Sequence, residues 1–206
     1  MTASSTRRAA SEPRLYPDRI GEVPRTGAID SVQGAELHLR QPLAEILNRD
    51  VLQRAAREYW RLITRFTLGM IRVTSDAGGQ SVVLLARPLV LLRFHSQEFE
   101  LSGGSGSVTW PIERGILVSR TGRNRGFLRL SVAQIDRSDA AGGTPVRVQM
   151  EVRNFYPWLR GSGAFARVGG WIYAQTQQRI HRLVTRAFLR RLARGALAGW
   201  ASRSTA

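Results

Sequence analysis

Apolar and polar residues alternate over short stretches through the middle of the chain, which predicts a series of antiparallel strands. The strands expected from this pattern are residues 70–74, 81–86, 89–94, 108–112, 128–132 and 146–152. Pro88 interrupts the pattern between the second and third of these strands, and turns that contain glycine separate the others. The last stretch alternates most regularly, with Val146, Val148, Met150 and Val152 on one side and charged or amide residues between them. We therefore expect one face of this strand to be buried and the other to be exposed to solvent.

A shorter alternation over residues 35–40 predicts a first strand, and a helical pattern follows it. Pro42 suits the first turn of a helix, apolar residues recur at helical spacing from 43 to 66, and Gly69 is a plausible stop. Residues 59–67 are rich in aromatic and β-branched side chains, so this part also fits the start of a strand.

Residues 166–197 form the longest predicted helix. Its apolar positions lie three and four apart, at Ile180, Leu183, Val184, Ala187, Phe188 and Leu192. A separate row of the same helix holds Arg179, Arg182, Arg186 and Arg190. The pattern predicts an amphipathic helix whose apolar face lies across the sheet and whose arginine row faces water.

These elements predict an α+β fold in which an antiparallel sheet wraps around the long C-terminal helix. Residues 1–34 are expected to be a flexible tail, 35–197 a single domain, and 198–206 a second short tail. No window approaches the roughly 20 apolar residues of a membrane-spanning helix, and residues 1–10 lack the apolar core of a secretory signal. We expect a cytoplasmic protein, with peripheral membrane association as an alternative.

The charge is strongly positive and unevenly placed. The chain has 31 basic and 15 acidic residues, a net charge of +16, and every basic residue is arginine. A high-GC genome explains the choice of arginine over lysine, but not the excess of cations over acids. No Asp or Glu follows Glu151, whereas arginines continue to 203. We expect the row Arg179, Arg182, Arg186 and Arg190 to face an anionic surface, and a membrane is favoured over nucleic acid because no nucleic-acid reading motif is present.

Catalytic and metal-binding motifs are not recognisable in the sequence. The chain has no cysteine, which excludes disulfides and thiolate chemistry. His38, His95 and His181 lie on separate predicted elements without the paired spacing of a zinc site, so no metal and no cofactor is predicted. No catalytic residue is assigned, and His181 is the one candidate acid or base.

The order of these elements over about residues 35–194 resembles the START-like, helix-grip superfamily, which includes polyketide cyclases and lipid-transfer domains. The resemblance rests on the succession of strand, helix, antiparallel strands and long last helix, and on no residue motif. It implies an apolar cavity between the sheet and the C-terminal helix, where a lipid or another hydrophobic small molecule binds.

Several side chains are candidates for contact with such a ligand. Gln177 and His181 share a side of the last helix with Val184 and Phe188, so a ligand or polar strand residues must satisfy them if that side is buried. The loop residues Arg120, Arg123 and Arg125 can clamp an anionic group, or be a solvated hairpin tip. The aromatic candidates are Trp110, Tyr156 and Trp158.

The sequence supports three hypotheses from different classes. The first is a binding module for a hydrophobic small molecule or lipid, with an anionic ligand group as a further option. The second is peripheral association with an anionic membrane, or less favourably nucleic acid, through the basic C-terminal helix. The third is an enzyme of the cyclase, dehydratase or hydrolase kind. The oligomeric state is left open.

Overall fold

The computed structural model describes residues 14–16, 19–22, 28–76, 78–84, 90–136, 143–156 and 183–192. The strands are β1 (Arg14–Leu15), β2 (Arg19–Glu22), β3 (Ile29–Leu39), β4 (Ile71–Asp76), β5 (Gly79–Leu84), β6 (Val90–Phe94), β7 (Glu98–Ser102), β8 (Ser105–Arg114), β9 (Phe127–Gln134) and β10 (Thr144–Phe155). The helices are α1 (Leu43–Ile46), α2 (Arg49–Phe66) and the 3₁₀ turn η1 (Arg120–Gly122), and residues 183–192 are also helical.

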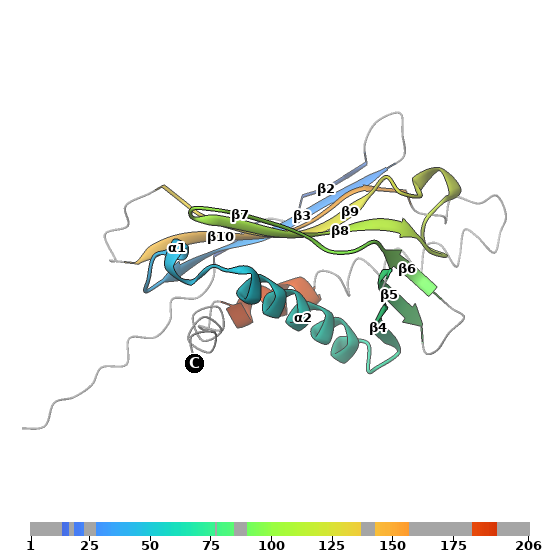
Figure 1. Cartoon of the computed structure of the whole chain (residues 1–206), viewed down its shortest axis with the longest axis horizontal. Helices are drawn as coiled ribbons and strands as arrows, with labels where there is room; N and C mark the ends of the chain where they lie inside the picture. The colour runs from blue at the N-terminus through green and yellow to red at the C-terminus, as the bar shows by residue number, and fades with distance from the viewer. Residues whose placement is uncertain are drawn as a thin grey trace, which may run out of the picture.

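The strands pair antiparallel in the order β1-β3-β10-β9-β8-β6-β5-β4, with β2 on β3 and β7 on β8. Figure 1 shows the long strands β3, β8, β9 and β10 as one layer, from which the short strands β4, β5 and β6 turn towards α2. The predicted α+β class with an antiparallel sheet is therefore confirmed.

The inner face of the long strands forms the core. Val146, Val148 and Met150 of β10 are buried, as their alternation predicted. The register places Val148 beside Val132 of β9 and Ala35 of β3, so apolar side chains form continuous rows across the sheet. Because directly paired residues point to the same side, each row presents one apolar surface to the helices.

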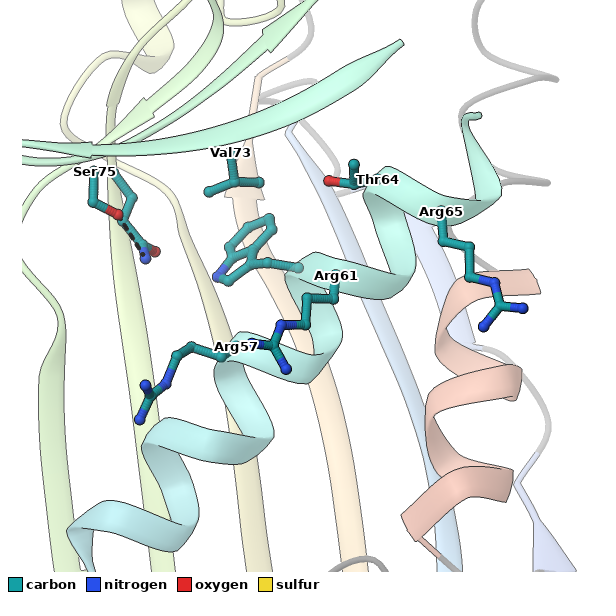
Figure 2. Close-up of a pocket in the computed structure, with 8 residues that line it drawn as sticks. Arg57, Arg61, Thr64, Arg65, Val73 and Ser75 are labelled. Carbon is teal, nitrogen blue, oxygen red and sulfur yellow. Dashed lines mark hydrogen bonds between the residues drawn. The ribbon is translucent and has the colours of Figure 1, made fainter. Parts of the chain in front are cut away.

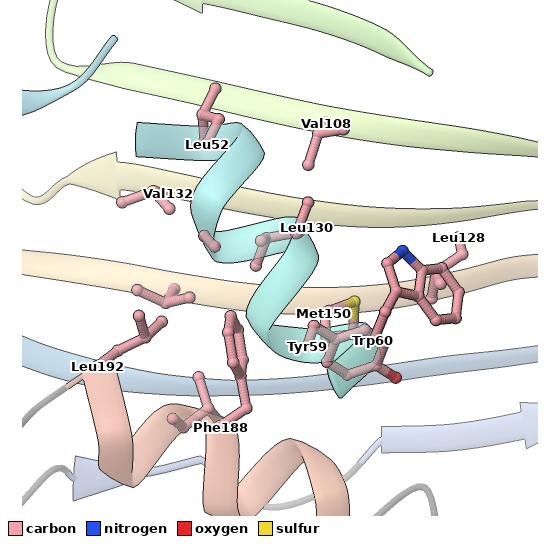
Figure 3. Close-up of a cluster of buried hydrophobic side chains, with 14 of the residues drawn as sticks. Leu52, Tyr59, Trp60, Val108, Leu128, Leu130, Val132, Met150, Phe188 and Leu192 are labelled. Carbon is pink, nitrogen blue, oxygen red and sulfur yellow. The ribbon is translucent and has the colours of Figure 1, made fainter. Parts of the chain in front are cut away.

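Helix α2 lies across these rows (Figure 3). Leu52, Tyr59 and Trp60 are among the α2 side chains buried there, so residues 59–66, whose assignment was open, are helical. The predicted helix is divided at Asn48, whose side chain accepts a hydrogen bond from the Val51 N–H at 2.9 Å and so caps α2. Among the described residues, no helix is both long and apolar enough to cross a membrane.

Residues 183–192 lie beside α2 on the same inner face of the sheet (Figure 3). Val184, Phe188 and Leu192 are buried, as predicted, and Phe188 packs edge-on against Tyr59 with ring centroids 5.6 Å apart. The prediction for Leu183 is wrong, because this side chain is 55% exposed, while Leu189 is buried in its place. The rest of the predicted helix 166–197 lies outside the described residues.

Strand β3 begins at Ile29, six residues before the predicted strand and inside the predicted tail 1–34. Two features of the sequence concealed this. Gly34 resembles a loop residue, but a Cβ there would lie 3.0 Å from the Val148 carbonyl oxygen, so the close strand pairing favours glycine. Ser31 and Gln33 are polar yet buried, which interrupts the apolar alternation.

Strand β7 was not predicted. Four of its five side chains are exposed, and Phe99 is half-buried. It pairs with one end of β8, whereas β6 pairs with the other end. An edge strand with so little buried surface carries almost no apolar pattern, and its absence from the prediction follows from that.

Candidate functional site

A groove of about 390 Å³ lies between α2 and the β4–β5 hairpin. Figure 2 shows α2 along one side and the strands along the other. The groove is lined by Arg57, Trp60, Arg61, Thr64, Arg65, Val73, Ser75 and Gln80. It forms because β4, β5 and β6 turn out of the main sheet and fold back over the second half of α2.

The helical wall of the groove is a single stripe of α2. Its lining residues are spaced three and four apart, which places them on one helix face. Arg57, Arg61 and Arg65 follow one another at every fourth position of this stripe. The Nε of Arg57 donates to the Gln53 carbonyl at 3.4 Å, an interaction that leaves the outer guanidinium nitrogens of Arg57 available.

Little negative charge opposes these arginines. A Glu58 oxygen lies 3.9 Å from the guanidinium of Arg61, whose side chain is 77% exposed, so this ion pair is weak. The other Glu58 oxygen lies 3.0 Å from Nε of Arg191 in the second helix. No Asp or Glu is among the residues that line the groove, and an anion entering it would therefore meet a net positive charge.

The strand wall changes from apolar to polar along its length. The register pairs Val73 with Val82 and Ser75 with Gln80, so these rows point to the same side. The Gln80 amide nitrogen donates to the Ser75 hydroxyl at 3.5 Å. The Gln80 amide oxygen is buried and has no hydrogen-bond partner among the described residues.

Trp60 joins the groove to the core. Its side chain is 7% exposed, and its ring centroid lies 5.4 Å from those of Tyr59 and Trp110 and 5.7 Å from that of Phe94. The indole Nε1–H is buried without a partner in the described part of the chain. A buried polar atom without a partner costs free energy, and the two residues that carry such atoms here, Trp60 and Gln80, both line the groove.

The nearest carboxylate on the hairpin is already engaged. Asp76 follows Ser75 but points to the opposite face of β4, where its oxygens lie 3.2 and 3.3 Å from the guanidinium nitrogens of Arg93. Arg93 also donates to Glu113 at 2.8 Å. The hydrogen bond and charge of Asp76, followed by those of Glu113, raise the pKa of Arg93. Asp76 therefore does little to neutralise the groove arginines.

Tyr59 is a buried titratable group that packs against the groove residue Trp60, with ring centroids 5.4 Å apart. Burial raises the pKa of its hydroxyl far above the usual range, and a hydrogen bond with Thr185 opposes this only partly. Tyr59 is consequently neutral at physiological pH. The groove lining itself contains arginine, hydroxyl, amide and indole groups, a set suited to binding and orienting an anion.

The predicted arginine loop and Tyr156 lie together, and none of these residues is among those that line the groove. Arg120, Arg123 and Arg125 are exposed in and after η1. The Tyr156 carbonyl accepts from the Ser119 N–H at 2.9 Å, which ties the end of β10 to this turn. The structure thus brings these four predicted site residues to one corner of the sheet.

The other predicted residues are distributed differently. Trp110 is fully buried beneath Trp60. Arg186 and Arg190 are exposed on the outer face of the helix 183–192, as the arginine row predicted. The remaining predicted site residues, Trp158, Gln177, Arg179, His181 and Arg182, lie outside the described residues.

Sequence reasoning missed the groove. The spacing of Arg57, Arg61 and Arg65 was visible in the predicted helix and could have suggested one basic stripe. Nothing local indicated that Ser75 and Gln80 would face it, because the folding back of the β4–β5 hairpin depends on tertiary packing.

No protein-family model matches the chain. No curated protein matches it either. Among solved structures, the chain is similar to Ara h 8.0201 at 11% identity and a TM-score of 0.33, over 78% of this chain and 98% of that one. It is similar to an HSP90 activator from Plasmodium falciparum at 14% identity and a TM-score of 0.28, over 68% and 86% of the two chains. CalU16 from Micromonospora echinospora matches at 9% identity and a TM-score of 0.26, over 92% and 96%. At such low values the fold class rests on the strand order and helix placement described above.

Proposed function

We propose that this protein is a binding module for a small amphipathic anion, which occupies the groove between α2 and the β4–β5 hairpin. The proposal is carried by one observation: the buried Trp60 N–H and Gln80 amide oxygen have no partner in the described chain, and both line a groove edged by arginines. A bound molecule that carries an acceptor for the Trp60 N–H and a donor for the Gln80 oxygen would satisfy both atoms and so recover the cost of burying them.

The lining indicates the chemistry of the ligand. Its apolar part would pack on Trp60 and Val73, while a carboxylate, sulfonate or phosphate would bind Arg57 and Arg61, whose planar guanidinium groups suit such oxyanions. The volume of about 390 Å³ falls within the range of small-molecule sites, roughly 300–1,000 Å³.

This location differs from the cavity expected between the sheet and the C-terminal helix. Over strands β8 and β9 that space is filled by α2, whose Leu52 and Tyr59 belong to the same buried cluster as Val108 and Leu130. Figure 3 shows these side chains packed between helix and strands. The proposal therefore keeps the hydrophobic ligand with an anionic group, and places it in the groove.

Two naphthalene probes separate the charge of the ligand from its apolar body. Anilinonaphthalene sulfonate carries an anionic group, and N-phenyl-1-naphthylamine has the same rings without it. We expect saturable one-to-one fluorescence binding of the sulfonate by the folded protein, and weaker binding of the neutral probe. Equal affinity for the two probes would remove the role assigned to the arginines.

Matched variants locate the site. Arg57→Gln and Arg61→Gln should each weaken binding of the sulfonate probe by about five- to tenfold, because hydrogen bonds to charged groups contribute about 1.5–3 kcal/mol when buried and less when partly exposed. Arg123→Gln removes the same charge from the predicted loop and serves as the control. If Arg123→Gln weakened binding and the α2 variants did not, the site would lie at the loop.

Trp60→Phe tests the indole N–H directly, since it keeps an aromatic ring in the core and removes the donor. We expect little change for the neutral probe and reduced affinity for probes that carry an acceptor. Native mass spectrometry of the purified protein, before and after organic extraction, would then identify any ligand that co-purifies.

A further inference from the structure

Helix α2 ends in an exposed apolar turn. Phe66 is 44% exposed, Leu68 90% and Met70 51%, and we call these three residues the apolar tip. In Figure 1 the turn between α2 and β4 lies at an outer corner of the molecule. Single exposed apolar residues are ordinary, but three within five positions form a patch that requires an explanation.

The tip is held by a hydrogen-bonded turn. The Gly69 N–H donates to the Thr64 carbonyl at 2.8 Å and the Leu68 N–H to the Arg65 carbonyl at 3.1 Å, which is the Schellman arrangement at a helix end. The buried Thr67 hydroxyl donates to the Ile63 carbonyl at 2.9 Å and accepts from the Ile71 N–H at 3.2 Å. These bonds fix the direction in which Leu68 projects.

Leu68 stands in a conformation that disfavours leucine. Its φ is 51°, in the left-handed region, at the position of the Schellman arrangement that glycine usually occupies. A leucine here costs free energy, and with 90% of the side chain exposed it recovers almost none by burial within the described chain. The backbone conformation of Leu68 therefore destabilises the isolated protein without an offsetting gain from burial, which is expected if the side chain is buried in a complex.

The surroundings of the tip are basic. Arg61, Arg65 and Arg72 are all exposed, and they lie within one helical turn or a few residues of it. No Asp or Glu occurs between Glu58 and Asp76 in the sequence. An apolar projection inside a ring of cations complements an anionic bilayer, where apolar side chains enter the acyl boundary and arginines meet phosphates.

We propose that the apolar tip docks this protein on anionic membranes. Three side chains fall far short of the roughly 20–30 residues a side of a standard protein interface, so a bilayer fits this surface better than a protein partner. The tip residues are not among those that line the groove. The apolar side chains of the tip are therefore separate from the groove, whereas Arg61 and Arg65 belong both to the groove lining and to the basic surroundings of the tip. The tip also differs from the arginine row of the C-terminal helix.

Leu68→Asn is the decisive variant, because asparagine tolerates the left-handed conformation and removes the apolar side chain. We expect it to lower the partition coefficient on phosphatidylserine–phosphatidylcholine vesicles by about tenfold or more, the equivalent of losing one buried leucine. We also expect the free energy of unfolding to stay the same or rise. A variant that binds vesicles more weakly but is at least as stable as wild type cannot owe the weaker binding to misfolding.

Leu101→Asn is the matched control. Leu101 is 48% exposed in β7, whose hairpin contacts Leu47 before α2, so it lies near the opposite end of that helix. Its replacement should leave vesicle binding unchanged. The proposal is overturned if wild-type protein does not bind anionic vesicles, or if Leu68→Asn binds as tightly as wild type.

The absence of cysteine from the chain permits a direct test of insertion. Leu68→Cys and Leu101→Cys would each carry a single nitrobenzoxadiazole label. Anionic vesicles should increase and blue-shift the emission of the label at 68 and leave that at 101 unchanged, and neutral vesicles should affect neither. Vesicle binding without a change at position 68 would show that another basic surface is responsible and would refute the tip.

Discussion

The rotation of the C-terminal helix can be tested with two leucines that the sequence and the structure treat in opposite ways. The sequence pattern places Leu183 on the buried face, whereas the structure leaves it 55% exposed and buries Leu189, which is 2% exposed. Leu183→Ala and Leu189→Ala remove the same atoms from the same helix. Their difference in stability therefore measures burial and little else.

The expected magnitudes are well separated. Truncating a buried leucine costs about 2–5 kcal/mol, so Leu189→Ala should lower the free energy of unfolding by that amount. For a domain of this size the melting temperature would fall by about 5–15 °C. Leu183→Ala should change stability by less than about 0.5 kcal/mol, because exposed positions rarely matter more and alanine favours helix.

Urea unfolding followed by far-ultraviolet circular dichroism measures both values, provided that the m-value is unchanged between variants. A cost for Leu183→Ala equal to or larger than that for Leu189→Ala would show that the helix is rotated as the sequence pattern suggested. The contacts of Phe188 and Thr185 with Tyr59 would then have to be revised.

Three further predictions concern local features. Because burial raises the pKa of Tyr59, its contribution to the free energy of unfolding should be constant below the ordinary tyrosine pKa of about 10 and fall as pH rises above it. Tyr59→Phe should flatten the dependence above a pH of about 10 in denaturant titrations at several pH values. Asn48→Ala removes the cap of α2 and should lower the free energy of unfolding by about 0.5–2 kcal/mol. Asn48→Asp keeps the acceptor and should lower it by less in the same denaturant assay. Gly122→Ala should lower the free energy of unfolding by roughly 1–3 kcal/mol, since the new Cβ would lie 2.5 Å from Cβ of Tyr156. In thermal melts this cost should shrink in a Tyr156→Gly background, which removes that Cβ.

Sequence alone predicted the elements whose pattern is regular. Strand β10 alternates without interruption, and its buried residues are those expected. In residues 183–192, Arg186 and Arg190 are exposed as predicted, because charged side chains reliably mark the solvent-exposed face of a helix. The error at Leu183 arose because six apolar residues of this helix span a wide arc, and a wide arc does not fix the rotation.

The candidate site was beyond prediction for a different reason. The groove depends on β4 and β5 leaving the plane of the main sheet, and this in turn depends on β8 pairing with β7 at one end and β6 at the other. Register between distant strands is not encoded in any local pattern. From the sequence, Ser75 and Gln80 are therefore indistinguishable from other polar strand residues. Their position in the groove follows only from the placement of the hairpin against α2.

Helix α2 contributes to the core, to the groove and to the apolar tip, because different faces of the helix and its C-terminal end form each of them. Tyr59 and Leu62 face the core, the stripe from Arg57 to Arg65 faces the groove, and the turn after Phe66 carries the apolar tip. Trp60 belongs to both core and groove, so replacing it affects stability and ligand binding together. Leu68 belongs to neither, and a variant there changes membrane binding without disturbing the groove. Variants at Leu68 and at Arg57 can consequently test the two proposed functions one at a time, whereas Arg61 and Arg65 contribute to both.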